Sequence, residues 1–131
     1  MTNENMIKVL VIEPKKKPVV REIEGGLRSL QGIVGGYIEA IYPFEDEVGI
    51  ICNEEGKING LPLNRGLYRN GELYDILCGT FIIAGLGTED FCSLSDDLLR
   101  KYAAMFMLPM EFAKVNGRIV AISMFEDLLE D

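Results

Sequence analysis

The side chains that could carry chemistry in this chain are carboxylates, thiols, lysines and tyrosines, because its 131 residues include no histidine. The absence of imidazole removes Ser-His and Cys-His nucleophilic pairs and the commonest general base near neutral pH. The obvious carboxylate pairs all fall in predicted turns or at a predicted helix start, where solvation, turn preference and the helix dipole favour acids. We therefore expect no catalytic residue among them and predict that the protein is not an enzyme. These pairs are Glu45/Glu47, Glu54/Glu55, Glu89/Asp90 and Asp96/Asp97.

The three cysteines, Cys52, Cys78 and Cys92, leave one thiol unpaired under any disulfide scheme, which is unusual for a small secreted domain. We expect reduced and mostly buried thiols, as is common for free cysteine. A structural zinc site needs four ligands, and without histidine the chain offers only these thiols and a carboxylate from widely separated segments. Phosphate-loop and EF-hand spacings are also missing from the sequence, and Gly85-Leu-Gly87 is only a fragment of a dinucleotide-binding turn. The sequence therefore predicts no metal and no cofactor.

One segment offers polar groups that suit binding better than catalysis. Leu61-Pro-Leu-Asn-Arg-Gly66 is bounded by proline and glycine and is predicted to be an ordered loop. In such a loop Asn64 and Arg65 could present an amide and a guanidinium fork to a carboxylate, a phosphate or the backbone of a partner. The alternative is structural: Asn64 caps a turn and Arg65 bridges one of the many nearby acids.

The charge of the chain limits its partners. Twenty-one acidic and thirteen basic residues give a net charge of −8, which opposes binding to a phosphate backbone, so we expect no direct nucleic-acid binding. The one basic cluster, Lys15–Lys17 between two prolines and followed by Arg21, is predicted as a solvated hairpin turn. The longest apolar runs are far shorter than the roughly 20 residues of a membrane span, and the N-terminus lacks the features of a signal peptide. We therefore expect a cytoplasmic protein that makes no membrane contact.

Runs of β-branched and apolar residues predict the strands. Ile7–Ile12 has the composition of a strand buried on both faces and is expected at the centre of the sheet, with Pro18–Glu24 returning beside it as a hairpin. Asn70-Gly71 is the strongest two-residue hairpin signal in the chain. Residues Tyr74–Cys78 and Thr80–Ala84 are predicted to form one long or interrupted strand. The remaining predicted strands are Tyr37–Tyr42, Val48–Asn53, Ile58–Leu61 after a tight turn at Glu54–Lys57, and a last strand within Val115–Ile122.

Two segments have the periodicity of helices. The first lies between Gly25 and Gly36 and is expected to end at Gly35-Gly36, which allow positive φ angles. The second is expected to begin at a capping box formed by Ser93 and Asp96 and to end before Pro109. The apolar positions are Leu27, Leu30, Ile33 and Val34 in the first helix and Leu98, Tyr102, Met105 and Phe106 in the second, with Leu94 predicted to pack on Leu99.

The order strands, helix, strands, helix, strand predicts an α+β fold, with a largely antiparallel sheet and two main helices packed on one face of it. We find no internal repeat or linker, so residues 6–122 are predicted to form a single domain. Residues 1–5 are then an N-terminal extension. Residues 123–131 form an acidic C-terminal tail, either a terminal helix or a frayed end.

Five segments spread along the chain are Ile7-Lys-Val-Leu-Val-Ile-Glu-Pro14, Leu30-Gln-Gly-Ile-Val-Gly-Gly-Tyr37-Ile-Glu39, Leu61-Pro-Leu-Asn-Arg65, Tyr74-Asp-Ile-Leu-Cys-Gly-Thr-Phe81 and Gly117-Arg-Ile-Val-Ala121. Together they resemble the domain-of-unknown-function 3846 family over roughly residues 6–122. The resemblance implies small proteins of Firmicutes and of their phages, plasmids or conjugative elements, with no established biochemical activity. Small proteins of such elements are often accessory factors that bind or block a host component. Within the matching stretches, Asn64-Arg65 and Cys78-Gly79-Thr80 are where a shared site is expected.

Three functions are compatible with these observations. The leading hypothesis is a non-catalytic binding module that engages a host protein or a small polar ligand through Asn64, Arg65, Gly79 and Thr80. The second is an acidic DNA mimic that inhibits a nucleic-acid-binding enzyme, which requires a continuous acidic stripe on the surface. The third is a carboxylate- or metal-dependent enzyme.

Overall fold

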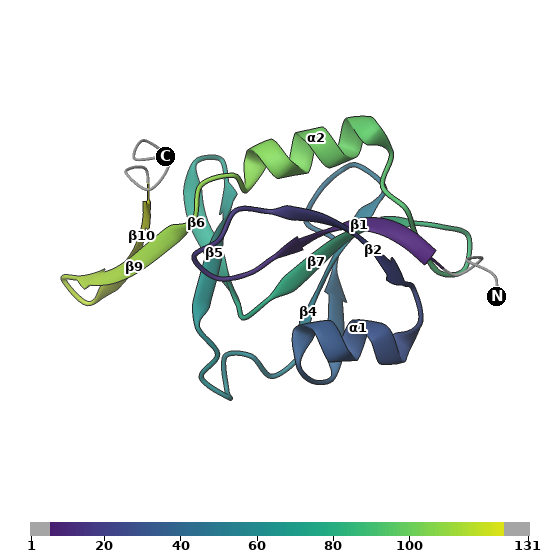
Figure 1. Cartoon of the computed structure of the whole chain (residues 1–131). Coiled ribbons are helices and arrows are strands. Elements are labelled where there is room, and N and C mark those ends of the chain that lie inside the picture. Colours follow the sequence, from purple (N-terminus) through teal and green to yellow (C-terminus); the bar gives the residue numbers. More distant parts are fainter. Residues whose placement is uncertain (1–5, 125–131) are drawn as a thin grey trace.

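The computed structural model describes residues 6–124, which contain two helices and ten strands, most of them in antiparallel pairs (Figure 1). This mixed composition confirms the predicted α+β fold. The predicted extension, residues 1–5, and residues 125–131 of the predicted tail lie outside the described residues. In chain order the elements are β1 (Met6–Ile12), β2 (Val19–Glu24), α1 (Leu27–Val34), β3 (Ile38–Ile41), β4 (Val48–Asn53), β5 (Leu63–Arg69), β6 (Glu72–Cys78), β7 (Phe81–Leu86), β8 (Phe91–Cys92), α2 (Asp96–Met105), β9 (Met110–Val115) and β10 (Arg118–Ser123).

The main sheet has six strands in the order β2-β1-β7-β4-β3, with the short β8 also paired to β7. All of its pairs are antiparallel, and the hairpin of β1 and β2 aligns Ile7 with Ile23 and Val11 with Val19, as predicted for the first two strands. The centre of the sheet is β7, between β1 and β4, rather than β1. Both strands are rich in apolar residues, with Lys8 of β1 as the one charged exception, which suits strands covered on both faces.

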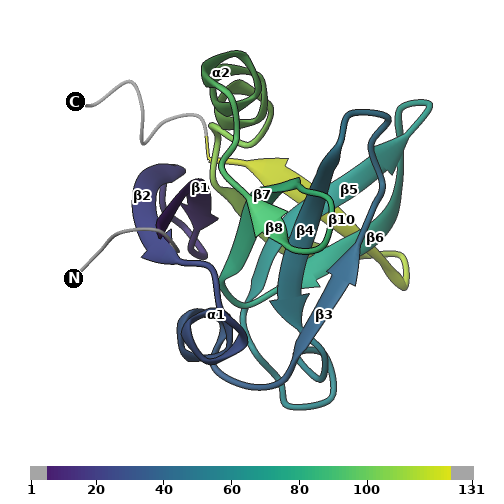
Figure 2. The same ribbon diagram turned by 90° about the vertical axis from the view of Figure 1, so that its right-hand side faces the viewer.

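The two helices cover opposite faces of this sheet, which corrects the prediction that both lie on one face. In Figure 1 α2 lies above the sheet and α1 below it, and the turned view in Figure 2 shows the same separation. Successive residues of β1 therefore enter different cores: Leu10 packs with Leu99 and Tyr102 of α2, while Val9 packs with Leu30 of α1.

Local signals fix both helices. Gly35 ends α1 with a φ of 84°, as predicted, and donates its N–H to the Gln31 carbonyl. The N-cap of α2 is Ser95, whose side chain accepts from the Leu98 N–H, so the predicted cap is wrong by two residues. Shifting the cap to Ser95 puts the predicted Leu94 and Leu99 contact at the staple positions of the helix, and both side chains are buried. Ser93 instead accepts a hydrogen bond from the Lys8 N–H.

Two further hairpins, β5–β6 and β9–β10, form separate two-stranded sheets. Asn70-Gly71, with φ angles of 53° and 81°, turns the chain between β5 and β6, as predicted. The predicted loop at Leu61–Gly66 is wrong, because most of it belongs to β5. The predicted strand Ile58–Leu61 is a turn followed by an irregular residue. The segments Tyr74–Cys78 and Thr80–Ala84, predicted as one long or interrupted strand, are separated at Gly79 into β6 and β7, which belong to different sheets.

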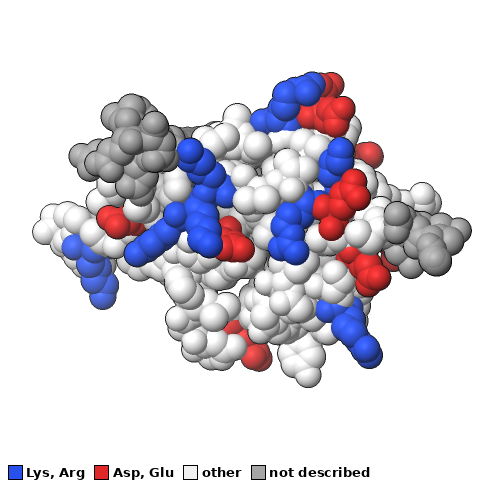
Figure 3. Space-filling view, viewed as in Figure 1, with Lys and Arg blue, Asp and Glu red and all other residues white. Residues whose placement is uncertain are grey.

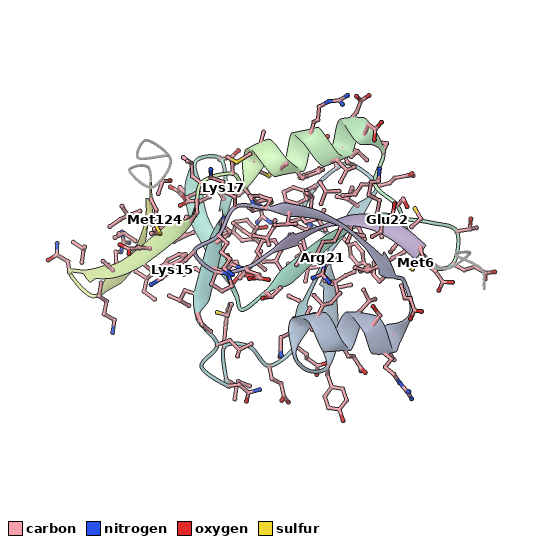
Figure 4. The ribbon with its side chains drawn as sticks, viewed as in Figure 1. Met6, Lys15, Lys17, Arg21, Glu22 and Met124 are labelled. Carbon is pink, nitrogen blue, oxygen red and sulfur yellow. The ribbon has the colours of Figure 1, made fainter. Side chains whose placement is uncertain are left out.

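The basic cluster forms the turn that was predicted for it. Lys15–Lys17 form the exposed turn between β1 and β2, and Arg21 lies on β2 (Figure 4). Among the described residues, neither helix has the length and apolar character that crossing a membrane requires.

Candidate functional site

The predicted binding residues Asn64 and Arg65 lie in the interior. Both are fully buried, and both belong to β5. Asn64 sits at a register shift in the pairing of β5 with β6, an irregularity of the kind that aims a side chain away from the regular ladder. The prediction that Asn64 and Arg65 present an exposed amide and guanidinium to a ligand is therefore wrong, because neither side chain faces solvent.

Asn64 and Arg65 instead hold distant segments together. The Asn64 amide donates to the carbonyl oxygens of Ile12 at 2.9 Å and Gly79 at 2.8 Å, and its own oxygen accepts from Arg65 Nη1 at 2.8 Å. Arg65 also donates to the carbonyl oxygens of Lys16 and Phe106. The predicted structural alternative is wrong in its details, because Asn64 caps no turn and the partners of Arg65 are carbonyl oxygens rather than an acid.

The other two predicted site residues follow β6. Gly79 has a φ of 78° and donates its N–H to the Pro62 carbonyl at 2.7 Å, which turns the chain from β6 into β7. The structure thus brings Asn64, Arg65 and Gly79 into one buried hydrogen-bond network. Thr80 is half-buried and adjacent in sequence to this network.

A cleft beside β6 is the hollow that carries charged groups together with thiols. We call it the polar cleft; its volume is about 330 Å³, and it is lined among others by Glu39, Cys52, Lys57, Asp75 and Cys78. Lys57 Nζ lies 2.6 Å from Asp75 Oδ1, and both side chains are partly exposed. This hydrogen bond, together with the charge of Asp75, raises the pKa of Lys57.

The turn after β4 positions Lys57. Asn53 begins it by accepting the Glu55 N–H at 2.8 Å and donating to the Val34 carbonyl. The turn then passes close to β6: a Cβ added to Gly56 would lie only 3.1 Å from the Cys78 carbonyl oxygen. This close approach brings Lys57 beside β6.

The thiols of the cleft are in environments that favour their neutral form. Burial, followed by the negative charge of Glu39, raises the pKa of Cys52 to about 11. Burial also raises the pKa of Cys78. A thiolate is the nucleophilic and metal-binding form, so neither side chain is activated for those roles at neutral pH.

A second hollow lies along the same strand. We call it the apolar hollow; its volume is about 440 Å³, and Lys57, Asp75, Ile76 and Cys78 line both it and the polar cleft. Arg69 lies over the Tyr74 ring, 4.3 Å from its centroid. The apolar side chains that complete this hollow are Leu63, Leu73, Tyr74 and Ile119.

Sequence reasoning missed Lys57 and Asp75, although one signal was available. Asp75 interrupts the apolar run Tyr74–Cys78, and a charged residue inside such a run calls for a partner. Lys57 carries no comparable signal, because lysine is ordinary in a turn. The four carboxylate pairs lie in turns or in the first turn of α2, as predicted, and all are exposed.

Within residues 6–124, no group of three or more Cys, Asp or Glu side chains is placed to hold a metal ion. The family model described as "Domain of unknown function (DUF3846)" matches residues 7–107, which span β1 to the end of α2 and exclude the hairpin of β9 and β10. No curated protein and no solved structure matches the chain.

Proposed function

Because the chain belongs to the family described as "Domain of unknown function (DUF3846)", whose description assigns no activity, we propose from the geometry that it is a non-catalytic binding module. Its ligand occupies the polar cleft. The observation that carries this proposal is the Lys57–Asp75 pair, which lies in a concave site lined by both charged and apolar side chains. A concave site in which polar groups converge beside apolar side chains is typical of ligand binding.

The site differs from the one expected from sequence, but the class of function is the same. The buried network of Asn64 and Arg65 fixes β5, and β5 in turn positions β6 and its Asp75. These two residues then support the site without touching a ligand. A host protein or a small polar ligand remains the expected occupant, in an accessory role within the cytoplasm.

The protonation states of the cleft favour binding over catalysis. The raised pKa of Lys57 keeps its amine protonated, which disfavours a role as base or nucleophile. The raised pKa of Cys52 keeps its thiol neutral. Binding by fixed charges needs neither group to change its protonation state.

Surface charge gives less support to a DNA mimic. On the face in Figure 3, Lys and Arg side chains lie among the Asp and Glu side chains, and no continuous acidic stripe crosses it. A phosphate-like row of carboxylates would require a more uniform arrangement.

The proposal is tested with two cleft variants, Lys57→Met and Asp75→Asn, and a control, Asp97→Asn, which breaks the exposed Asp97–Arg100 pair on α2. Amino acids, nucleosides, polyamines and short peptides serve as probes, and thermal unfolding reports binding because a ligand stabilises the folded state by mass action. At least one probe class is expected to raise the Tm of the wild type and of the control. We expect its affinity to change at least tenfold in both cleft variants, in opposite directions for a charged probe because the two substitutions remove opposite charges. Equal binding by all four proteins, or no stabilising probe, would contradict the proposal.

A further inference from the structure

Strand β6 has an edge that no strand of residues 6–124 covers. It pairs with β5 on one side only, whereas β1, β4 and β7 each have neighbours on both sides. An uncovered edge presents backbone N–H and C=O groups that can pair with another chain. The question is which backbone groups of β6 point outward.

The pair formed by Gly66 and Ile76 shows which backbone groups point outward. These residues are directly opposite each other in the ladder of β5 and β6. The Gly66 N–H points away from β6 and donates to Met110 Sδ at 3.4 Å, while the Ile76 N–H donates to Asp75 Oδ1 at 2.8 Å. Both amides therefore point away from the partner strand, as in a non-hydrogen-bonded antiparallel pair. In such a pair the carbonyl of each residue points to the same side of the strand as its N–H. Ile76 thus offers one donor and one acceptor to the open edge.

Neither the N–H nor the carbonyl of Ile76 is paired with a strand. The Asp75 carboxylate takes the place that a neighbouring strand's carbonyl would occupy, and Lys57 holds that carboxylate. The Ile76 carbonyl oxygen has the Cys78 thiol at 4.0 Å, and a thiol is a weak donor. The outward N–H and carbonyl of Ile76 are therefore satisfied by side chains that an incoming strand can replace.

The two hollows flank the same stretch of β6. Both are lined by Asp75, Ile76 and Cys78, one with charged walls and one with apolar walls. The polar cleft is bordered by three acidic side chains, Glu39, Glu54 and Asp75, against the single cation of Lys57. This excess of negative charge is complementary to a basic side chain.

We propose that the open edge of β6 binds an extended peptide segment of a protein partner, which pairs with the backbone of Ile76. A Lys or Arg side chain of the peptide enters the polar cleft, and an apolar side chain enters the apolar hollow. Strand addition of this kind obtains affinity from main-chain hydrogen bonds and specificity from side-chain pockets. The inference rests on the proposed function and names the occupant of the same site.

The test uses the full chain and a phage-displayed library of random ten-residue peptides. We expect selection of peptides in which a basic residue lies near an apolar one. The best peptide is then synthesised in versions that carry N-methyl groups on alternate backbone amides, in the two possible phases. One phase blocks the amides that face β6 and is expected to weaken binding at least tenfold, while the other phase leaves binding within about twofold of the unmodified peptide.

Protein variants give a second readout. Asp75→Asn retains an acceptor for the Ile76 N–H but removes the charge, so it is expected to weaken binding of a lysine peptide at least tenfold and of its norleucine analogue much less. Ile76→Pro removes the outward N–H and is expected to abolish binding; circular dichroism checks its fold, and the N-methylated peptides decide the matter if it does not fold.

The outcomes separate this inference from the proposed function. No enriched peptide, or equal effects of the two N-methyl phases, overturns strand addition. If small probes still bind in the polar cleft, the proposed function stands without it. If neither peptides nor small probes bind, both fail, and Asp75 then serves only to protect the edge.

Discussion

Arg65 donates two hydrogen bonds to the carbonyl oxygen of Phe106, from Nε at 3.1 Å and from Nη2 at 2.9 Å. Phe106 is the C-cap of α2, a helix with no basic residue in its last turn, so the cation of Arg65 lies at the negative end of the helix dipole. Burial lowers the pKa of Arg65 to about 10, which leaves the guanidinium charged at neutral pH. Two backbone carbonyls and the Asn64 amide oxygen, rather than a carboxylate, thus solvate this buried charge.

The Arg65→Lys variant is expected to lose stability although it keeps the charge. Lysine is a single ammonium and lacks the planar fork that reaches several carbonyls at once. Buried carbonyls left without a donor cost about 1–3 kcal/mol each, so we expect a loss of about 2–4 kcal/mol in the free energy of unfolding, measured by urea titration. Arg28→Lys on the exposed surface of α1 is the control. A loss below about 0.5 kcal/mol for Arg65→Lys would contradict the role assigned to the fork.

Two glycine substitutions are expected to have opposite effects. Gly79→Ala puts a Cβ at a φ of 78° and only 2.8 Å from Leu61 Cδ1, which is expected to destabilise the fold by at least about 1–2 kcal/mol. Gly32→Ala adds a Cβ to α1 where nothing lies within 4 Å, so helix propensity is expected to raise stability by about 1 kcal/mol. Thermal unfolding of both variants checks the two signs, and each serves as the other's control.

Asp46 is expected to make stability depend on acid pH. Hydrogen bonds from Lys101 at 2.6 Å and Tyr102 at 2.8 Å hold the pKa of this carboxyl below its ordinary value of 3.8. A carboxyl with a lowered folded pKa stabilises the fold above its unfolded pKa and loses that contribution as pH falls through the folded value. The Tm difference between the wild type and Asp46→Asn should therefore be constant from pH 7 to about 5 and shrink below about pH 4. A difference that stays constant down to pH 2 would rule this out.

Cys52 is expected to react slowly with alkylating reagents in the folded protein. Its pKa rises from 9.0 to about 11, which lowers the thiolate fraction at pH 8 by about 100-fold. In a Cys78→Ala, Cys92→Ala background, iodoacetamide labelling followed by mass spectrometry should be at least about 100-fold slower in buffer than in urea. Similar rates in the two conditions would show that the thiol is accessible and ionised.

The sequence by itself determined those local elements whose signals lie within a few residues of one another. β-Branched runs placed β1 and β4, Asn70-Gly71 placed the turn of β5 and β6, and Gly35 placed the end of α1. Apolar, β-branched runs and glycine conformation are properties of short segments, so they need no knowledge of the partner.

The tertiary structure alone decided that Asn64 and Arg65 are buried and which distant segments meet. Asn64 reaches Ile12 across 52 positions and Arg65 reaches Phe106 across 41, so no local pattern could show that both side chains are buried. The meeting of Lys57 with Asp75 likewise depends on how the turn after β4 packs against β6. Polar residues in a segment bounded by proline and glycine are usually exposed, and only long-range packing supplies the carbonyl partners that allow burial here.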